Sequence, residues 1–206
     1  MTNKEKQTED KIVEAAREVF IEKGMSGARM QEIADRASIN KSLLHYYFRS
    51  KEKLFNFVFA KVTNRIGNMI TSTMDKNISI EDKVRKFTEV YIDILLKNPF
   101  LPNFILNEMT RNPESIIKQF TDSKIEPIKH LKPLQQQLEE EGYSIKANDF
   151  IVNLISLVIF PIASKPLIQR LIFNGDNKEY KEYIITRKKT IVTFVLNALK
   201  GYSTNE

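Results

Sequence analysis

The stretch GMSGARMQEIADRASINKSLLHYYFRSKEKLF, residues 24–55, contains two short helical patterns separated by only three residues. The first pattern predicts a helix of about two turns from apolar residues spaced three or four apart: Met30, Ile33, Ala34 and Ala37. The second predicts a helix over Lys41–Tyr47, and Ser38–Asn40 between them has room only for a tight turn. Two short helices joined in this way form a helix-turn-helix.

The helix at Lys41–Tyr47 has two chemically different faces, because successive helical residues are about 100° apart. The apolar face carries Leu44 and Phe48, with Tyr47 at its border. The opposite side carries Ser42, His45 and Tyr46, flanked by Lys41 and Leu43. We interpret the apolar face as core. The other face is rich in the donors that contact phosphates and base edges, which a core helix does not need.

Helical patterns continue on both sides of this stretch. A first helix is predicted with Thr8 as its N-cap and Gly24 at its end. Its apolar stripe consists of Ile12, Ala15, Ala16, Val19 and Phe20. Ser50 is predicted to cap a fourth helix that runs to about Met74 and links the N-terminal helices to the rest of the chain.

The remaining residues also predict helices. A fifth helix begins at Ser79 and is stopped by Asn98-Pro99. Residues 102–142 predict two or three helices, punctuated by prolines at Pro113, Pro127 and Pro133. Glu139–Glu141 is interpreted as a solvated helix end.

Two helices are predicted at the C-terminal end. Residues 150–173 form a strongly apolar pattern with kinks expected at Pro161 and Pro166. The last helix is expected to begin near Asp176 and to end before Gly201.

Composition supports an all-α globular protein. The chain is 42% hydrophobic and 28% charged, and has only six Gly and seven Pro in 206 residues. Cysteine is absent, which excludes disulfides and thiolate metal sites. The polar N-terminus does not resemble a signal peptide, and the apolar run at residues 150–163 is shorter than the ~20 residues of a membrane span. We expect a cytoplasmic protein that does not contact the membrane.

Positive charge is concentrated on the quoted stretch. The chain has a net charge of +6 overall, and residues 36–53 contain five cations against the single anion Glu52. Residues 1–35 contain six cations and eight anions. An α-helix fits the major groove of DNA, which is ~12 Å wide. The donor-rich face and the local positive charge together favour binding to double-stranded DNA.

Two other classes of function were weighed. An enzyme is not expected, because the two histidines, His45 and His130, are far apart and no glycine-rich phosphate loop or metal-ligand spacing is present. We therefore expect no catalytic residue, metal or cofactor. The alternative is a helical protein-interaction module whose helix-turn-helix is degenerate and does not bind specific DNA.

Residues 24–55 resemble the DNA-binding domain of the tetracycline-repressor (TetR) family. The resemblance rests on a combination of positions: Gly24, Ile33-Ala34, Ala37, Ile39, Leu44, Phe48, Lys51-Glu52 and Leu54. It covers roughly the first quarter of the chain, and the rest agrees only in being helical and of the expected size.

The resemblance implies a two-domain organisation and a function. A helix-turn-helix DNA-binding domain of three helices at residues 1–50 would be joined by a long helix to a helical ligand-binding and dimerisation domain at 51–206. Such a regulator is a homodimeric repressor that binds a pseudo-palindromic operator and is released by a small molecule. Its dimer interface would use the last two helices, residues 148–173 and 178–200. The residues also leave open an activator, or a repressor without an inducer.

This chain departs from the family pattern at three places. Ala28-Arg29 stands where Thr or Ser is frequent, Ser38 replaces a usual Gly, and His45 and Tyr47 exchange the common Tyr and His. By position we assign base edges to Lys41, Ser42, Leu43 and Tyr46. Phosphate contacts are assigned to Arg29, Gln31, His45, Tyr47 and Lys51. Five residues could line a ligand pocket, but each is better interpreted as ordinary core: Tyr91, Phe104, Met109, Phe120 and Asn153.

Overall fold

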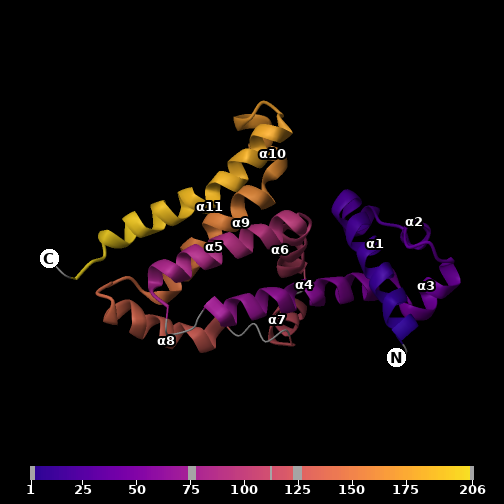
Figure 1. Cartoon of the computed structure of the whole chain (residues 1–206), viewed down its shortest axis with the longest axis horizontal. Coiled ribbons are helices and arrows are strands. Elements are labelled where there is room, and N and C mark those ends of the chain that lie inside the picture. The colour runs from indigo at the N-terminus through magenta and orange to yellow at the C-terminus, as the bar shows by residue number, and fades with distance from the viewer. Residues whose placement is uncertain (1–2, 74–77, 112, 123–126, 205–206) are drawn as a thin grey trace. The chain divides into compact units, whose positions relative to one another are not determined.

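The computed structural model describes residues 3–73, 78–111, 113–122 and 127–204. Within those ranges the chain forms eleven α-helices, and the only β pairing is an isolated antiparallel bridge between Tyr143 and Ser203. The all-α class predicted from the sequence is confirmed. Figure 1 shows the helices in chain order, from indigo at the N-terminus to yellow at the C-terminus.

The chain divides into two compact units, each built from two segments: Met1–Thr63 with Asn98–Gln119, and Asn64–Lys97 with Phe120–Glu206. The helices of the first unit are α1 (Asn3–Gly27), α2 (Met30–Arg36), α3 (Lys41–Tyr47), the beginning of α4 (Lys51–Thr73), α6 (Leu101–Arg111) and most of α7 (Pro113–Asp122). The second unit contains the rest of α4 and α5 (Ile80–Lys97), α8 (Pro127–Glu140), α9 (Ala147–Ala163), α10 (Lys165–Ile172) and α11 (Asn177–Lys200). The boundary between the units falls within α4.

The first unit is organised around the apolar stripe of α1. All five predicted stripe residues of α1 are buried, as are Ile33 and Ala34 of α2. The rings of Phe20 and Phe55 meet edge to face with their centroids 4.8 Å apart, so α4 packs against α1. Phe100 joins this pair, 5.9 Å from Phe55. The aromatic cluster holds α1 in a fixed position, and this position supports the two short helices α2 and α3.

The first helix begins earlier than the sequence predicts. It starts at Asn3, and the hydroxyl of Thr8 donates to the carbonyl oxygen of Lys4 at 3.0 Å. The prediction of Thr8 as N-cap is wrong, because a threonine inside a helix can return its hydroxyl to the preceding turn. Gly24 has φ +65°, which breaks the helical backbone where the sequence predicts an end.

The predicted starts of two long helices are confirmed. The Ser50 hydroxyl accepts from the backbone N–H of Lys53 at 3.2 Å at the start of α4. The Ser79 hydroxyl accepts from the N–H of Asp82 at 3.1 Å at the start of α5.

The α5 N-terminus also has a distant partner that changes the interpretation of Glu141. The Glu141 carboxylate accepts from the backbone N–H of Ile80, with both oxygens at 3.1 Å. Gln137 donates to the same carboxylate and to the carbonyl of Ile78. Glu141 is therefore a tertiary helix cap and not simply a solvated helix end, because unpaired N–H groups of a helix start attract a carboxylate.

The prolines divide the chain differently from the prediction. Pro113 and Pro127 begin α7 and α8, but Pro133 lies inside α8 and does not end a helix. The single helix predicted over residues 150–173 is two helices, α9 and α10, bent by 73°. The break falls at Ser164, and Pro166 lies in the first turn of α10, where a proline costs no hydrogen bond. Among the described residues no single helix is long and apolar enough to span a membrane, although this bent pair meets those criteria together.

The second unit packs α11 and α9 against α5, with α8 and α10 against α9 (Figure 1). Its buried side chains include Val84, Tyr91, Leu95, Leu154, Val158, Ile184 and Ile191. The hydroxyl of Tyr180 donates to the Pro161 carbonyl at 3.0 Å. Asp176 caps α11 as predicted, accepting from the N–H groups of Lys178 and Glu179.

Candidate nucleic-acid interface

The turn between α2 and α3 is tight because Ser38 adopts a left-handed conformation. Its φ is +56°, and the N–H of Ile39 returns to the carbonyl of Ala34 at 3.0 Å. A side chain is disfavoured in this region, which explains why glycine is the easier residue at such a position. Asn40 then caps α3, its side chain accepting from the Leu43 N–H at 2.7 Å. Asn40 was missed in the sequence, although an asparagine directly before a helix is among the best N-caps.

The two faces of α3 lie where the periodicity predicts. Leu44 is fully buried and Phe48 is 7% exposed, so the apolar face packs on the core. The outer face of α3 is formed by exposed residues: Lys41, Ser42, Leu43, His45 and Tyr46. Tyr46 is 74% exposed, so its aromatic ring and its hydroxyl are both open to contact with a partner.

Three residues predicted to contact phosphates already have intramolecular partners. The Gln31 amide donates to Asp35 at 2.8 Å. The Lys51 ammonium donates to the carbonyls of Ser26 and Ala28, at 3.3 and 3.2 Å. Lys51 therefore ties the start of α4 to the loop before α2.

Tyr47 is the third of these residues. It is half-buried, and its hydroxyl donates to the carbonyl of Glu5 at 3.3 Å. Its ring stands edge-on to that of Tyr46, with the centroids 5.6 Å apart. The end of α3 is thus fixed to the first turn of α1.

The two remaining phosphate candidates are exposed. Arg29 occupies the extended N-cap position of α2, with φ −121°. The Nδ1 of His45 lies 3.4 Å from the carbonyl oxygen of Arg49. Arg29 directly precedes α2, whereas His45 lies within α3, near its C-terminal end.

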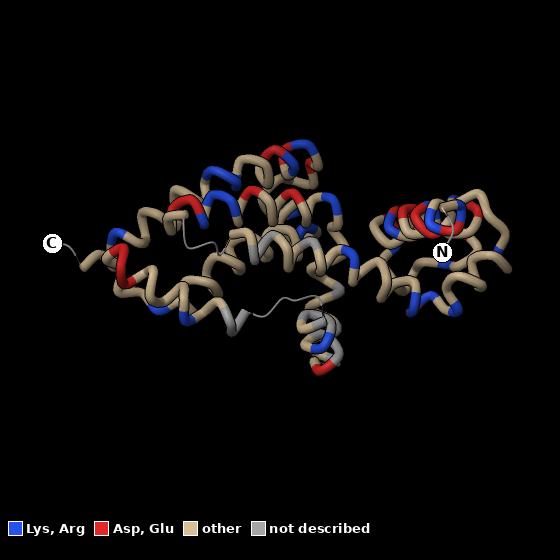
Figure 2. Tube along the Cα trace, turned by 60° about the horizontal axis from the view of Figure 1, so that its bottom comes forward, with Lys and Arg blue, Asp and Glu red and all other residues tan. Residues whose placement is uncertain are grey.

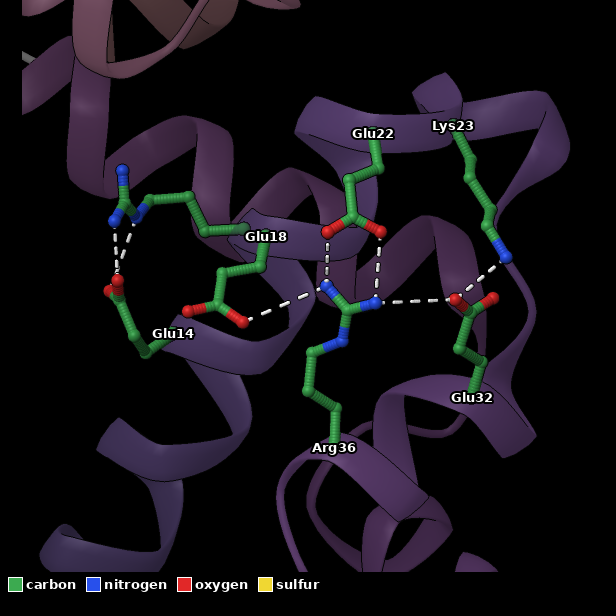
Figure 3. A network of polar contacts seen from close by, with 7 residues as sticks. Glu14, Glu18, Glu22, Lys23, Glu32 and Arg36 are labelled. Carbon is green, nitrogen blue, oxygen red and sulfur yellow. Dashed lines mark hydrogen bonds and ion pairs between the residues drawn. The ribbon is translucent and has the colours of Figure 1, made fainter.

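An ion-pair network fastens α2 to α1 (Figure 3). Arg36 binds both carboxylate oxygens of Glu22, at 2.8 and 2.9 Å, and also approaches Glu18 and Glu32. Lys23 pairs with Glu32 at 2.7 Å. Hydrogen bonds from Arg36 lower the pKa of Glu22 below its usual 4.5. In the sequence, Arg36 is one of the cations of the basic stretch. In the structure its charge is engaged in ion pairs that position α2.

Figure 2 shows that most acidic positions of this unit gather around α1. The outer face of α3 itself carries Lys41 and no carboxylate. A positive charge can bind phosphate, and the flat and branched side chains beside Lys41 can contact base edges.

Hollows outside this face occur in the second unit. A cavity of about 340 Å³ lies between α9 and α11, lined among others by Asn153, Phe194 and Tyr202. An open groove of about 720 Å³ lies between α5 and α11 and is lined by Arg85, Lys188 and polar neighbours. The described part of the chain contains no cluster of three or more side chains suited to hold a metal.

The residues considered for a ligand pocket differ in their surroundings. Asn153 lines the cavity between α9 and α11, whereas Tyr91 is buried and Met109 is 53% exposed. Burial raises the pKa of Tyr91 to about 12, as expected of a phenol within an apolar core. The side chains of Phe104 and Phe120 lie outside the described part of the structure.

Two curated bacterial regulators are similar over most of the chain. A probable HTH-type transcriptional regulator of Bacillus subtilis, YttP, is 25% identical over 179 residues, covering 84% of this chain and 86% of YttP. IcaR of Staphylococcus epidermidis, a negative transcriptional regulator of the biofilm operon icaADBC, is 27% identical over 157 residues, covering 73% of this chain and 79% of IcaR.

A solved structure shares the fold. The transcriptional regulator FadR of Bacillus subtilis, in complex with stearoyl-CoA, superposes with a TM-score of 0.64 at 11% identity, covering 90% of this chain and 96% of FadR. Residues 12–58, which include α2, α3 and the start of α4, match the model of bacterial regulatory proteins of the tetR family. The helix-turn-helix, the helical second unit and these similarities agree: residues 12–58 carry the DNA-binding domain of the tetR family of bacterial regulatory proteins, on a chain that is similar to transcriptional regulators over most of its length.

Proposed function

We propose that this protein is a cytoplasmic repressor that binds a pseudo-palindromic operator as a homodimer and is released by a small molecule. The observation that carries the proposal is the outer face of α3, an exposed surface of donors and one aromatic ring on a helix whose other side is core. Residues 1–50 would read DNA, and residues 51–206 would bind the ligand and the second subunit.

The outer face has side chains for both kinds of DNA contact. Lys41, Ser42, Leu43 and Tyr46 are proposed to reach base edges, with Leu43 against a thymine methyl group. Arg29 and His45, both exposed, are proposed to hold phosphates directly. For Gln31, Tyr47 and Lys51 a phosphate contact requires sharing or exchanging the hydrogen bonds they already make.

Exposed apolar residues on the last helices support a homodimer. Val152 and Phe160 of α9 and Phe194 of α11 are each 62% exposed, and Leu171 of α10 is 71% exposed. A patch of this kind favours burial against a second surface. A symmetric dimer also suits two half-sites one helical turn apart, ~34–36 Å.

Repression and release by a ligand are supported by the relatives. IcaR is described as a negative regulator, and FadR was solved with stearoyl-CoA. The cavity of about 340 Å³ between α9 and α11 has room for a small apolar molecule.

Selection of bound sequences from a random duplex pool tests the proposal. Purified protein at near-physiological salt should enrich a pseudo-palindrome, and sedimentation of the complex should give two subunits per duplex. The variant Tyr46→Ala should lose the enrichment, whereas Lys132→Ala on α8, at an exposed position outside the proposed dimer interface, should keep it. Absence of any enrichment with the wild-type protein would overturn the proposal.

The alternative, a protein-interaction module with a degenerate helix-turn-helix, predicts a different salt dependence. Binding through phosphates weakens steeply with salt, by a slope of about −0.9 per contact in a double-logarithmic plot. A shallow slope on DNA and on heparin would favour the interaction module.

A further inference from the structure

The part of α1 that the sequence pattern did not predict lies against the end of α3. The helix begins at Asn3, more than a turn before Thr8. The hydrogen bond from Tyr47 to the Glu5 carbonyl joins this early turn to the helix that carries the outer face. Glu5 and Tyr47 are both half-buried, so the contact is part of the packing of the first unit.

The position of Glu5 determines where its neighbours point. Glu5 is seven residues before the buried Ile12, two turns along the same side of α1, and therefore faces the core. Lys4 and Lys6 are each about 100° away from it, on opposite flanks, and both are exposed. Two ammonium groups thus border the end of α3 that presents His45 and Tyr46.

Ion pairs divide the cations of the first unit into two groups. Those paired with carboxylates are Arg17, Lys23, Arg36 and Lys61. Those for which the described residues supply no ion pair are Lys4, Lys6, Lys11, Arg29, Lys41, Arg49, Lys51, Lys53 and Lys118, of which Lys51 donates to backbone carbonyls. Uncompensated charge therefore extends from the ends of α3 to the first turn of α1. A phosphate can bind these groups without breaking an internal ion pair.

We propose that the first turn of α1, Asn3–Lys6, is a second DNA contact in which Lys4 and Lys6 neutralise phosphates beside the groove entered by α3. The proposal rests on the DNA-binding function proposed above. Duplex DNA carries one negative charge per ~1.7 Å of its axis, so cations next to a groove-bound helix meet the backbone. Tyr47 then acts as a positioning residue, holding this turn in place through the Glu5 carbonyl.

A charge-matched pair of variants tests the contact. Lys4→Gln/Lys6→Gln is compared with Lys132→Gln/Lys146→Gln, which removes the same charge from exposed positions outside the proposed dimer interface. The dissociation constant for the selected operator is measured as a function of salt. We expect the first variant to lower the salt slope by about 1.8, equivalent to about 60-fold weaker binding at 0.1 M salt. The Lys132→Gln/Lys146→Gln variant should keep the wild-type slope.

The outcomes separate the two proposals. If both double variants bind like the wild type, and the wild type still selects an operator, the N-terminal contact is wrong and the DNA-binding function stands. If the wild type selects no operator, both are wrong.

The role of Tyr47 is tested by Tyr47→Phe in two backgrounds. In the wild-type background the change should lower the salt slope without altering the net charge or the thermal unfolding midpoint. In the Lys4→Gln/Lys6→Gln background it should have no further effect, because the lysines it positions are gone. An equal loss in both backgrounds would show that the Tyr47 hydroxyl contacts phosphate itself, and would overturn the positioning role.

Discussion

At the scale of single residues, Tyr46 is the side chain on which recognition of the DNA sequence should depend most. It is 74% exposed, yet it stands on a helix only seven residues long whose other side is core. Its ring is held edge-on by Tyr47, which limits the entropy that it loses on binding. A rigid aromatic with a hydroxyl tip can pack on a base edge and form a hydrogen bond at the same time.

Tyr46→Ala should weaken binding to the selected operator by about 1–3 kcal/mol and leave binding to random duplex almost unchanged. Equilibrium titration of both duplexes at one salt concentration measures the difference. Equal losses on both would mean that Tyr46 contacts the phosphate backbone. Thermal unfolding should not change, since the side chain makes little contact with the core.

Ser38 is a second informative residue, because its φ of +56° strains an L-amino acid. Ser38→Gly should stabilise the first unit by up to about 1 kcal/mol, the relieved strain being partly offset by the entropy of the unfolded chain. Ser38→Val should destabilise it, because a β-branched side chain fits this region poorly.

Denaturant titration followed by circular dichroism measures both Ser38 variants. Ser42→Gly is the matched control: the chemical change is the same, but Ser42 lies within α3, where glycine is unfavourable. Stabilisation by Ser42→Gly as well, or destabilisation by Ser38→Gly, would contradict the strain at Ser38.

At the scale of elements, α2 is a short helix whose position depends on ion pairs as much as on its two buried apolar residues. Seven residues are too few for a helix that is stable in isolation. Arg36 supplies tertiary contacts to Glu22, Glu18 and Glu32 at the end that leads into the turn. The position of α2, and through the turn the position of α3, therefore depends on a guanidinium group bound to glutamates of α1.

This network predicts a dependence on pH. The pKa of Glu22 is lowered by Arg36, so near pH 4 the folded state binds fewer protons than the unfolded state. Its contribution to stability is present above the usual carboxyl pKa of 4.5 and is lost as the pH falls through the lowered value. Arg36→Ala should reduce stability at neutral pH and make the loss between about pH 5 and 3 shallower.

Arg17→Ala is the control for Arg36→Ala. Arg17 pairs with Glu14, which also lies on α1, and lowers the pKa of that glutamate. Both variants should flatten the acid limb of the stability curve. Only Arg36→Ala should increase amide hydrogen exchange in α2; similar exchange in both would argue against the fastening role.

At the scale of the whole molecule, two opposite flanks of α11 differ in what they face. Phe194 lines the cavity shared with α9, whereas Ile185 lines the groove shared with α5. The two are nine residues apart, about 180° around the helix, and are exposed by 62% and 56%. If α9 and α11 form the homodimer interface, these flanks should respond differently to a buried charge.

Phe194→Glu should convert the dimer to a monomer and weaken operator binding more than tenfold, because a carboxylate is costly in an apolar interface. Ile185→Glu should remain a dimer with nearly unchanged affinity. Sedimentation velocity over a range of concentrations measures the oligomeric state. If both variants dissociate, or neither does, the interface is not on the α9 side of α11.

The sequence by itself determined the all-helical class, the helix-turn-helix and the two faces of α3. These features depend on local rules: the period of apolar residues, the caps at Ser50, Ser79 and Asp176, and the scarcity of glycine and proline. Such rules act within one turn of helix, so they can be read along the chain.

Only the tertiary structure decided what depends on residues distant in sequence. The early start of α1 is fixed by Tyr47, 42 residues away, and the α5 N-terminus by Glu141, 61 residues away. Arg36 and Lys51 belong to one basic stretch of the sequence, but both have intramolecular partners in the structure. Arg36 binds Glu22 on α1, and Lys51 donates to the carbonyl of Ser26 at the end of α1. The sequence records the charge of each side chain, but the free positive surface depends on which charges the fold has already neutralised.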